Sequence, residues 1–458
     1  MKLYNTMSGK KEEFVPHRAG HVNMYVCGPT VYDFVHVGNM RVQVVFDSLR
    51  RYLLYKGLQV TMVQNFTDVD DKIIARAAEE GLPSSEVAEK YIRENFADSD
   101  NMAVCRANAY PRVTDEMDSI IAMVGELVAA GKAYENAGHV FFDAQNAEGY
   151  GKLSKKNVDD LLAGARVEVS DLKRSPVDFV LWKPAKDSPN EPFWESPWGA
   201  GRPGWHIECS AMVRKFLGYV DIHGGGADLI FPHHENEIAQ SEALQSEPFA
   251  KYWMHVGMLT NGHKKMSKSL GNFFTLRETA EKFPHELIRF FLISGHYRMP
   301  MEYSEALLES AQKALERIKN CRALLLEAAD DKAELPKEAE SFKADFEARL
   351  DDDFNTADAV AVIFELVRFA NTRLHEGGLS GSQARGVAEL IDSMCGLLGL
   401  SFAAEESDVD AEIEALIAER QAARAAKDWA AADQIRDTLA EKGIVLEDTP
   451  SGVRWTRK

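Results

Sequence analysis

The first quarter of the chain alternates short apolar runs with apolar residues at helical spacing. An apolar run at 22–26 is followed by a helical pattern over 38–56 and by a second apolar run at 58–64. Strand, helix and strand in this order are typical of a β-α-β unit, whose two strands are parallel. Sheet elements are expected to resume near 205–222 and 253–259. The sequence therefore predicts an α/β fold that is interrupted in its middle.

The interruption spans about 116–200 and has a different pattern. It holds a helical stretch at 118–129, a predicted hairpin around 140–142, and a return segment rich in proline and tryptophan. We interpret it as an insertion into the sheet domain.

The last third of the chain is patterned mainly for helices. After an acidic linker at 403–408, two further helical stretches (411–426 and 429–442) and a hairpin with strands at 444–446 and 453–455 predict a small α+β module. The predicted parts are 1–115 with 201–303, then 116–200, 304–402 and 403–458. The third part reads as a bundle of four helices, at 304–328, 338–349, 356–376 and 382–398.

Composition narrows the class of protein. The chain has 458 residues, 45% of them hydrophobic, which is enough for about three domains. Its net charge of −19 argues against indiscriminate nucleic-acid binding, although a local basic face stays compatible with it. Five cysteines without paired spacing fit a reducing, cytoplasmic location, and no apolar run is long enough to predict a membrane span or a secretion signal.

Two lysines and two hydroxyls in the run Lys265-Met266-Ser267-Lys268-Ser269 are the first candidate chemistry. They follow Gly262, which lets the backbone bend, and are suited to holding a triphosphate. A shorter Lys-x-Ser-Lys would more often be a solvated basic turn.

A second phosphate-binding candidate begins the helix at 38–56. His36 and Asn39 lie at its N-terminus, where free N–H groups and the helix dipole attract anions, and Gly38 permits close approach. On its own this pattern more often means a helix cap with an incidental histidine. Likewise, the triple glycine before Asp228 is merely a turn unless a nucleotide uses Gly226 and Asp228.

A metal site is the third candidate. His233 and Glu237 are four residues apart and should project from one helix face, while His234 with Glu237 is an alternative pair. A plain surface pair is the commoner meaning of this spacing. Sequence spacing does not show whether Cys27 and Cys209 meet, and the other three cysteines read as buried structural thiols: Cys105, Cys321 and Cys395.

Together, the His-x-Gly-Asn and Lys-Met-Ser-Lys-Ser signatures resemble those of class I aminoacyl-tRNA synthetases. The stretches 27–33, 204–210 and 231–237 are similar to cysteinyl-tRNA synthetases in particular, and the resemblance runs nearly end to end. One departure is Asn39, where many members have a second histidine, but asparagine keeps a hydrogen-bond donor. The resemblance implies a Rossmann-like catalytic domain with a connective insertion, a helical bundle and an anticodon-binding module at 403–458.

The resemblance also implies the reaction. It is the ATP-dependent ligation of L-cysteine to tRNA(Cys) through cysteinyl-adenylate, by a monomer. One Zn²⁺ per chain would bind the substrate thiolate and select it over serine, and Mg²⁺ would accompany ATP. The ligands that the family would place on zinc are Cys27, Cys209, His233 and Glu237.

Further roles carry over residue by residue. His36, Asn39, Lys265 and Lys268 are expected to be catalytic, and Gly226 and Asp228 join His36, Asn39 and Lys268 in binding ATP. Each pocket assignment has a structural alternative: a helix cap for Thr67, a core side chain for Trp205, a strand-end histidine for His223 and a structural tryptophan for Trp455. The expected cysteine contacts are Cys27, Thr67, Trp205 and His223, and the expected tRNA contacts are Arg454, Trp455 and Arg457.

Three other functions stay open at this point. A zinc-dependent cysteine ligase acting on an amino-sugar acceptor would share both signatures but should lack the terminal module. A catalytically silent, zinc-stabilised binding protein is a second. A zinc hydrolase built on His233, His234 and Glu237 is a third, and it would leave the lysine run unexplained.

Overall fold

The structure, a computed structural model, forms two compact units, Met1–Ser401 and Phe402–Lys458. Within the part that it describes, no helix is both long and apolar enough to cross a membrane. The described residues are 1–157, 171–186, 191–261, 264–265, 274–402, 408–425, 428–441, 444–449 and 452–457.

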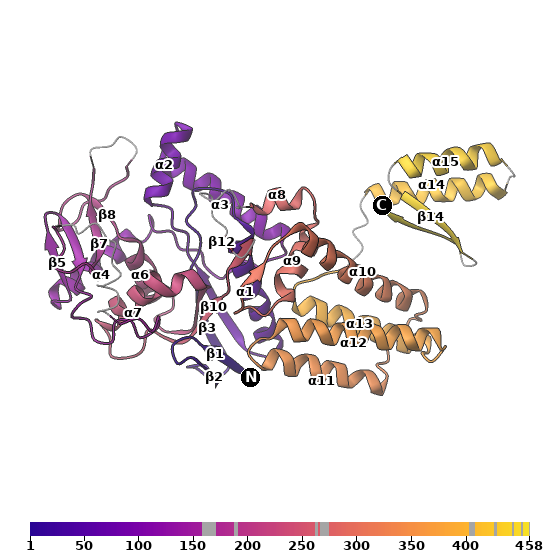
Figure 1. Cartoon of the computed structure of the whole chain (residues 1–458), viewed down its shortest axis with the longest axis horizontal. Helices are drawn as coiled ribbons and strands as arrows, with labels where there is room; N and C mark the ends of the chain where they lie inside the picture. The colour runs from indigo at the N-terminus through magenta and orange to yellow at the C-terminus, as the bar shows by residue number, and fades with distance from the viewer. Residues whose placement is uncertain are drawn as a thin grey trace. The chain divides into compact units, whose positions relative to one another are not determined.

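A parallel four-stranded sheet lies at the centre of the first unit (Figure 1). Its order is β10-β9-β3-β4, and every neighbouring pair is parallel. Helix α1 (Val37–Tyr55) connects β3 to β4, as the β-α-β pattern predicts. The α/β fold is therefore confirmed, with strands β3 (His21–Val26), β4 (Gln59–Gln64), β9 (Val220–Gly226) and β10 (Ala250–Val256).

Glycine allows α1 to pack directly on β9. A Cβ placed on Gly224 would lie 2.0 Å from the Phe46 ring of α1, and one on Gly225 would lie 3.1 Å from the His234 ring. Gly224 and Gly225 therefore allow neighbouring side chains to pack closely against β9. Only Gly226, at the end of the strand, is partly exposed.

The expectation of sheet structure from residue 205 onward is wrong for the first part of that range. Trp205–Phe216 forms helix α6, and the strand begins only at Val220. Ile207, Ala211 and Met212 share the buried side of this helix, a spacing of four and five residues that fits a helical face.

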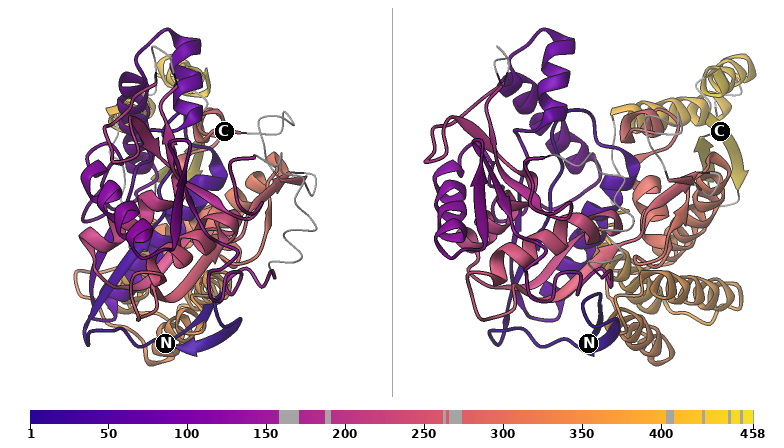
Figure 2. Two further views of the ribbon diagram at one scale, coloured as in Figure 1. Left: turned by 90° about the vertical axis from the view of Figure 1, so that its left-hand side faces the viewer. Right: turned by 60° about the vertical axis from the view of Figure 1, so that its left-hand side comes forward.

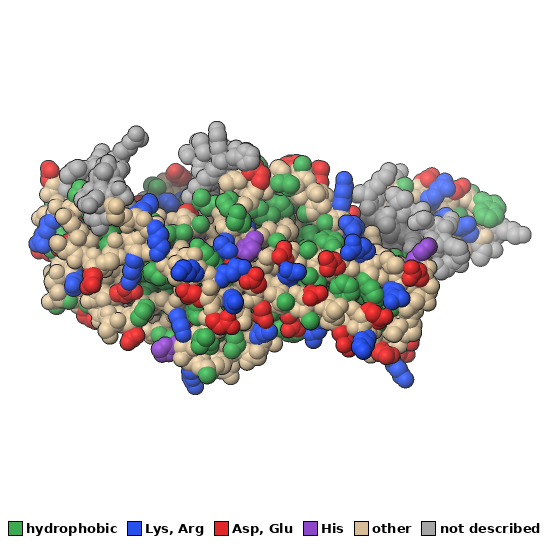
Figure 3. Space-filling model, turned by 60° about the horizontal axis from the view of Figure 1, so that its bottom comes forward, with side chains coloured by type: hydrophobic (Ala, Val, Ile, Leu, Met, Phe, Trp, Pro, Cys, Tyr) green, Lys and Arg blue, Asp and Glu red, His purple; other side chains and the backbone are tan. Residues whose placement is uncertain are grey.

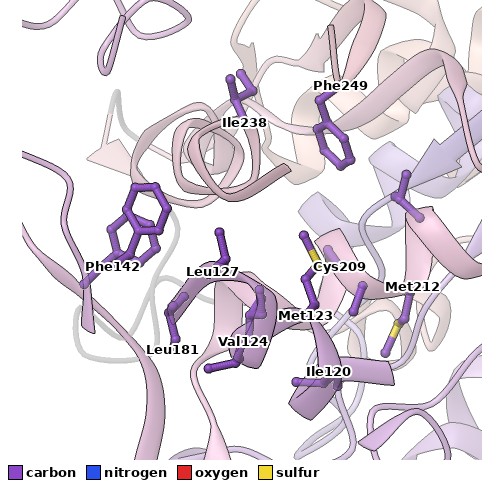
Figure 4. Packing of buried hydrophobic residues seen from close by; sticks show 14 of the residues in the cluster. Ile120, Met123, Val124, Leu127, Phe142, Leu181, Cys209, Met212, Ile238 and Phe249 are labelled. Carbon is purple, nitrogen blue, oxygen red and sulfur yellow. The ribbon is translucent and has the colours of Figure 1, made fainter. Parts of the chain in front are cut away.

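The insertion forms a separate antiparallel sheet of order β5-β6-β7-β8. Helix α4 (Met117–Ala129) packs on α6, with Ile120, Met123 and Val124 in the same core cluster as Met212 (Figure 4). Cys209 lies on this buried side of α6, so the packing fixes its position. The strands are β5 (Ala133–Asn136), β6 (His139–Phe142), β7 (Phe179–Pro184) and β8 (Gly201–Pro203).

Four helices follow the sheet domain in the first unit, as the periodicity predicts. In two views the insertion and these helices lie on opposite sides of the parallel sheet (Figures 1 and 2). The helices are α10 (Glu305–Glu327), α11 (Lys337–Asp351), α12 (Thr356–His375) and α13 (Gly381–Leu397).

Further described elements belong to the first unit. They are β1 (Lys2–Asn5), β2 (Lys10–Glu13), α2 (Asp71–Glu80), α3 (Ser84–Asn101), η1 (Ala227–Leu229), η2 (Ile230–His234), α7 (Glu235–Glu242), β11 (Leu259–Asn261), β12 (Lys264–Lys265), α8 (Leu276–Ala280), α9 (His285–Ser294) and β13 (Met301–Glu302).

The second unit has the predicted α+β composition. Ile417, Leu439 and Ile444 form its small core among the described residues. Its elements are α14 (Asp408–Ala425), α15 (Trp429–Glu441), β14 (Ile444–Thr449) and β15 (Gly452–Arg457), the last two antiparallel.

Charges of both signs are interspersed on the face drawn in Figure 3. Ion pairs such as Lys11 with Asp352 (2.8 Å) and Arg76 with Asp33 (2.7 Å) neutralise part of the basic side chains. The excess of acidic residues therefore does not form one uniform field on that face.

One buried carboxylate joins the amino-terminal strand to the helical bundle. Asp353 is fully buried, and its Oδ1 accepts the Tyr4 N–H (2.7 Å) and the Tyr297 hydroxyl (2.8 Å). Its Oδ2 accepts Arg298 Nε–H at 2.7 Å. The backbone at Asp353 has a positive φ of 66°, which aspartate and asparagine tolerate better than most residues.

We expect Asp353→Ala to lower the free energy of unfolding by about 3 kcal/mol, because three donors would lose a buried charged acceptor. Urea unfolding followed by tryptophan fluorescence measures this loss. Asp353→Asn is the matched control: it tolerates the same backbone and keeps one acceptor, so it should lose less. Equal, small losses in both variants would contradict the role of the carboxylate.

Candidate metal centre and active site

Two thiols, an imidazole and a carboxylate meet in the buried interior next to the carboxyl end of β3. Cys27 follows β3, Cys209 lies on α6, His233 lies in η2 and Glu237 lies in the first turn of α7. One potential ligand atom from each lies within 4.8 Å of the others. The structure thus brings together the four residues that sequence spacing alone left apart.

The distances within this group are short. Cys27 Sγ lies 3.8 Å from Cys209 Sγ and 3.5 Å from Glu237 Oε1. His233 Nε2 lies 3.0 Å from the same Glu237 oxygen, and its Nδ1 lies 3.0 Å from His206 Nδ1. Such a partner on the far nitrogen is typical of metal-ligating histidines, whose ring orientation it fixes.

The helix that carries Glu237 is anchored to the insertion. Glu235 is buried and accepts the N–H groups of Leu153 (3.3 Å) and Ser154 (2.8 Å). The His233–Glu237 contact is the one predicted for i and i+4, although the α-helix begins only at Glu235 and a π-helical turn precedes it. The face of the helix was predicted correctly, but its start was not.

Electrostatics in this pocket favour a bound cation. Burial alone would lower the pKa of His233, but the charges of Glu237 and Cys209 outweigh it and raise that pKa to about 10. Hydrogen bonding to Cys27 lowers the pKa of Cys209 to about 6, whereas burial raises the pKa of the Cys27 thiol. Protons therefore balance negative charge in the metal-free protein, and a metal ion would replace them.

The donor set fits zinc, which takes sulfur, imidazole nitrogen and carboxylate oxygen in a tetrahedral site. Glu237 Oε2 is buried and lies 3.2 Å from His223 Nε2. A buried carboxylate that faces imidazoles and thiols instead of water is suited to bind a metal ion.

A second donor set overlaps the first. It contains Cys27 and Glu237 again, with His223 and His234 as the other members. His234 Nδ1 lies 2.8 Å from His255 Nε2, and His255 Nδ1 lies 2.8 Å from Thr6 Oγ1. Neither His206 nor His255 was predicted to lie at the site, because nothing in the local sequence pattern singles them out.

Trp205 borders the metal candidate from its more open side. Its ring stacks on that of His233 with centroids 4.1 Å apart, and 38% of the residue is exposed. The core alternative for Trp205 is therefore wrong. His223, by contrast, is fully buried, on β9.

Thr67 is buried and donates its hydroxyl to Glu208 at 3.1 Å. The cap of α2 is Asp70, which accepts the Lys72 N–H, so Thr67 does not cap this helix. Asn65, which the sequence analysis missed, accepts the Gly28 N–H at 2.9 Å beside the metal candidate. Its position two residues before Thr67 is the only signal that the sequence offers.

The phosphate-binding candidates lie at the edges of the described structure. His36 caps α1, and its Nδ1 accepts the Asn39 N–H at 3.1 Å. Gly226 ends β9, and Asp228 is exposed just after it. The backbone of Lys265 lies in β12, but its side chain, and Lys268 entirely, lie outside the described residues, as do the side chains of Arg454, Trp455 and Arg457 on β15.

The fold places the chain among the class I tRNA synthetases. Residues 13–313 match the family model for the class I (C) tRNA synthetase catalytic domain, and 345–403 match the DALR domain. A Mycobacterium tuberculosis methionyl-tRNA synthetase in complex with methionyl-adenylate shares the fold, with a TM-score of 0.60 at 14% identity over 82% of this chain and 89% of that one.

Full-length relatives narrow the class. Cysteine–tRNA ligase from Carboxydothermus hydrogenoformans is 51% identical over the whole of both chains, and that from Heliobacterium modesticaldum is 50% identical over 100% of this chain and 99% of its own. Residues 406–455 match the cysteinyl-tRNA ligase anticodon binding domain. The chain belongs to the cysteine–tRNA ligase family.

We expect the purified protein to hold about one zinc ion per chain, and Cys209→Ser to lose most of it, because serine removes a thiolate from the donor set. Elemental analysis after desalting measures the content. Cys321→Ser is the matched control, since Cys321 is a buried thiol of α10 far in sequence from the candidate ligands. Equal zinc in both variants would contradict the assignment.

Proposed function

We propose that this protein ligates L-cysteine to tRNA(Cys) at the expense of ATP. The proposal is carried by one observation: a buried Cys27, Cys209, His233 and Glu237 group lies directly beside the partly exposed Trp205. The chain is 51% identical to a cysteine–tRNA ligase over the full length of both proteins, which supports the reaction. The match of residues 406–455 to the anticodon binding domain supports tRNA as the acceptor.

The first step activates the amino acid. The cysteine carboxylate attacks the α-phosphorus of ATP, and pyrophosphate leaves, giving cysteinyl-adenylate. His36 and Asn39, at the N-terminus of α1, would hold phosphate with the positive end of the helix dipole. Lys265 and Lys268 would offset the charge that develops on the leaving pyrophosphate, with Mg²⁺ on the ATP.

Gly226 and Asp228 would bind the nucleoside half of ATP. Gly226 offers a partly exposed backbone at the end of β9, and Asp228 offers a carboxylate for the ribose hydroxyls. In the second step a ribose hydroxyl at the tRNA end attacks the cysteinyl carbonyl, and AMP leaves. Neither step needs a covalent bond to the protein.

Selection of cysteine would use the Cys27, Cys209, His233 and Glu237 site. Zinc bound there would supply a soft Lewis acid that favours a thiolate over the hydroxyl of serine. Trp205 is placed to cover a small side chain beside His233, and Thr67 and His223 complete the proposed cysteine pocket with Cys27.

Recognition of tRNA would involve the second unit. Arg454, Trp455 and Arg457 lie on one short strand, β15. In the register of the hairpin, Arg454 is opposite Glu447 of β14 and Trp455 is opposite Leu446. Basic and aromatic residues in this combination suit phosphate contact and base stacking. The four-part division of the chain, a monomeric state and a cytoplasmic location complete the proposal.

Transfer of labelled cysteine to total tRNA with Mg-ATP tests the function. We expect charging with cysteine and not with serine, and loss of charging after zinc is removed and recovery after it is restored. Cysteine-dependent pyrophosphate exchange without tRNA charging would favour the amino-sugar ligase instead. Absence of both reactions would favour a silent homologue.

Replacement of Lys268 tests the lysine motif. We expect Lys268→Ala to lower the kcat of pyrophosphate exchange by roughly 100- to 1,000-fold, because a charge that stabilises the transition state is lost. The KM for cysteine should stay unchanged. Lys282→Ala, which removes an exposed lysine paired with Glu305, is the control and should keep full activity. Equal activity of the two variants would contradict the assignment.

A further inference from the structure

A buried guanidinium on α1 is not used by the chemistry described above. Arg41 is fully buried, and the ion pairs among the described residues include none with Arg41, whose pKa is shifted by burial and by no neighbouring charge. Burial lowers its pKa to about 10, so the side chain is still a cation at neutral pH. Because a buried charge without a counter-ion is costly, its hydrogen bonds must compensate.

Those hydrogen bonds all go to backbone carbonyls of two neighbouring segments. Nη1 donates to Gly257 (2.6 Å) and Met299 (3.0 Å), and Nη2 donates to His296 (3.1 Å). The Gly257 N–H donates to the Tyr297 carbonyl at 2.7 Å. A Cβ on Gly257 would lie 2.3 Å from the Met299 carbonyl oxygen, so the two segments touch directly beside the guanidinium.

The two segments lead into paired strands. Gly257 lies just before β11 (Leu259–Asn261), and Met299 lies just before β13 (Met301–Glu302). The strands run parallel, and Thr260 Oγ1 donates to Glu302 at 2.7 Å. In the sequence, β11 is followed by β12 (Lys264–Lys265), which pairs with β11 and contains the first residue of the lysine motif 265–269.

The chain on the other side of that stretch is attached to α1 as well. The Val37 N–H donates to the Phe274 carbonyl (3.2 Å), and the Leu276 N–H donates to the Val35 carbonyl (2.9 Å). Both flanks of the lysine motif are thus held near the start of α1, one by backbone hydrogen bonds to Val35 and Val37 and the other by Arg41.

We propose that Arg41 is a positioning residue that sets β11, and with it the start of the lysine motif, relative to the His36–Asn39 turn of α1. This inference rests on the proposed function, because it concerns the alignment of two ATP-binding signatures. The planar fork of arginine reaches three carbonyls at once, which a lysine ammonium at the same position cannot reproduce. A displacement of about 1 Å in such a frame costs up to 100-fold in rate.

Arg41→Lys tests the proposal, with Arg289→Lys as a matched control. Arg289 is also buried and donates to backbone carbonyls, those of Leu398 (2.9 Å) and Met102 (2.8 Å). It differs in lying on α9, in being ion-paired with Asp47 near the middle of α1, and in making no hydrogen bond to the described segments that flank the lysine motif. Cysteine-dependent pyrophosphate exchange gives kcat and KM for each variant, and thermal unfolding gives the folded fraction. We expect Arg41→Lys to lower kcat roughly 10- to 100-fold with the KM for cysteine retained.

Arg289→Lys should lose a similar amount of thermal stability and keep its kcat per folded molecule. Amide hydrogen exchange of the peptides 254–261 and 295–303 gives a readout that needs no activity. Both peptides should exchange faster in Arg41→Lys and not in Arg289→Lys.

Wild-type kcat in Arg41→Lys, or the same kcat loss in both variants, would overturn the role of Arg41 and leave the proposed function standing. Unchanged exchange of both peptides in Arg41→Lys would overturn it independently. A wild-type enzyme that performs no pyrophosphate exchange would instead refute the proposed function, and the two failures are therefore distinguishable.

Discussion

The burial of like charges is the constraint on which the centre of this molecule depends. Cys27, Cys209 and Glu237 converge in one buried group, and each is negative when deprotonated. Unpaired buried charge costs several kcal/mol, so such a pocket must be filled by protons, imidazolium or a metal ion. Without a metal ion, the raised pKa of His233 and the lowered pKa of Cys209 favour an imidazolium beside a thiolate, so that the two charges offset each other.

The same constraint explains how much of the fold surrounds the pocket. The insertion anchors α7 through Glu235, and the core between α4 and α6 fixes Cys209. The pocket therefore draws on residues far apart in the chain, and its geometry is set by packed elements and not by one loop. Sites supported in this way hold their ligand geometry more firmly than sites on loops.

Much of the fold was predictable because periodicity reports local structure directly. Helix α1, the flanking parallel strands and the helices α10 to α13 follow from repeating apolar positions. The range 205–216 was predicted to be sheet and is helix α6, because a short apolar segment has too few turns for its periodicity to distinguish a helix from a strand. The i,i+4 rule predicted a shared face for His233 and Glu237 but left His234 with Glu237 open as an alternative, and both imidazoles lie near Glu237 Oε1, at 3.0 and 3.9 Å.

Long-range contacts were not predictable in the same way. Cys27 and Cys209 are separated by most of the sheet domain, and only topology brings them within 3.8 Å. His255 and Asn65 meet the site because β10 and β4 are placed near it by strand order, a property that no local pattern contains. The family resemblance supplied the four ligand candidates, whereas the structure added His206, His255 and Asn65 around them.

A donor set of this composition also bears on selectivity. Serine and cysteine differ by one atom, and a pocket that separates near-isosteres by shape achieves roughly 10- to 200-fold. A borderline-soft metal ion such as zinc, if held by two thiolates, would distinguish thiolate from hydroxyl by bonding, because the hydroxyl keeps its proton at neutral pH and is a harder ligand. Trp205 stacked on His233 keeps one side of this centre covered by an aromatic ring while the residue stays partly exposed. Cysteine would then be distinguished from serine when the amino acid first binds, by the bond to the metal and not by the shape of the pocket.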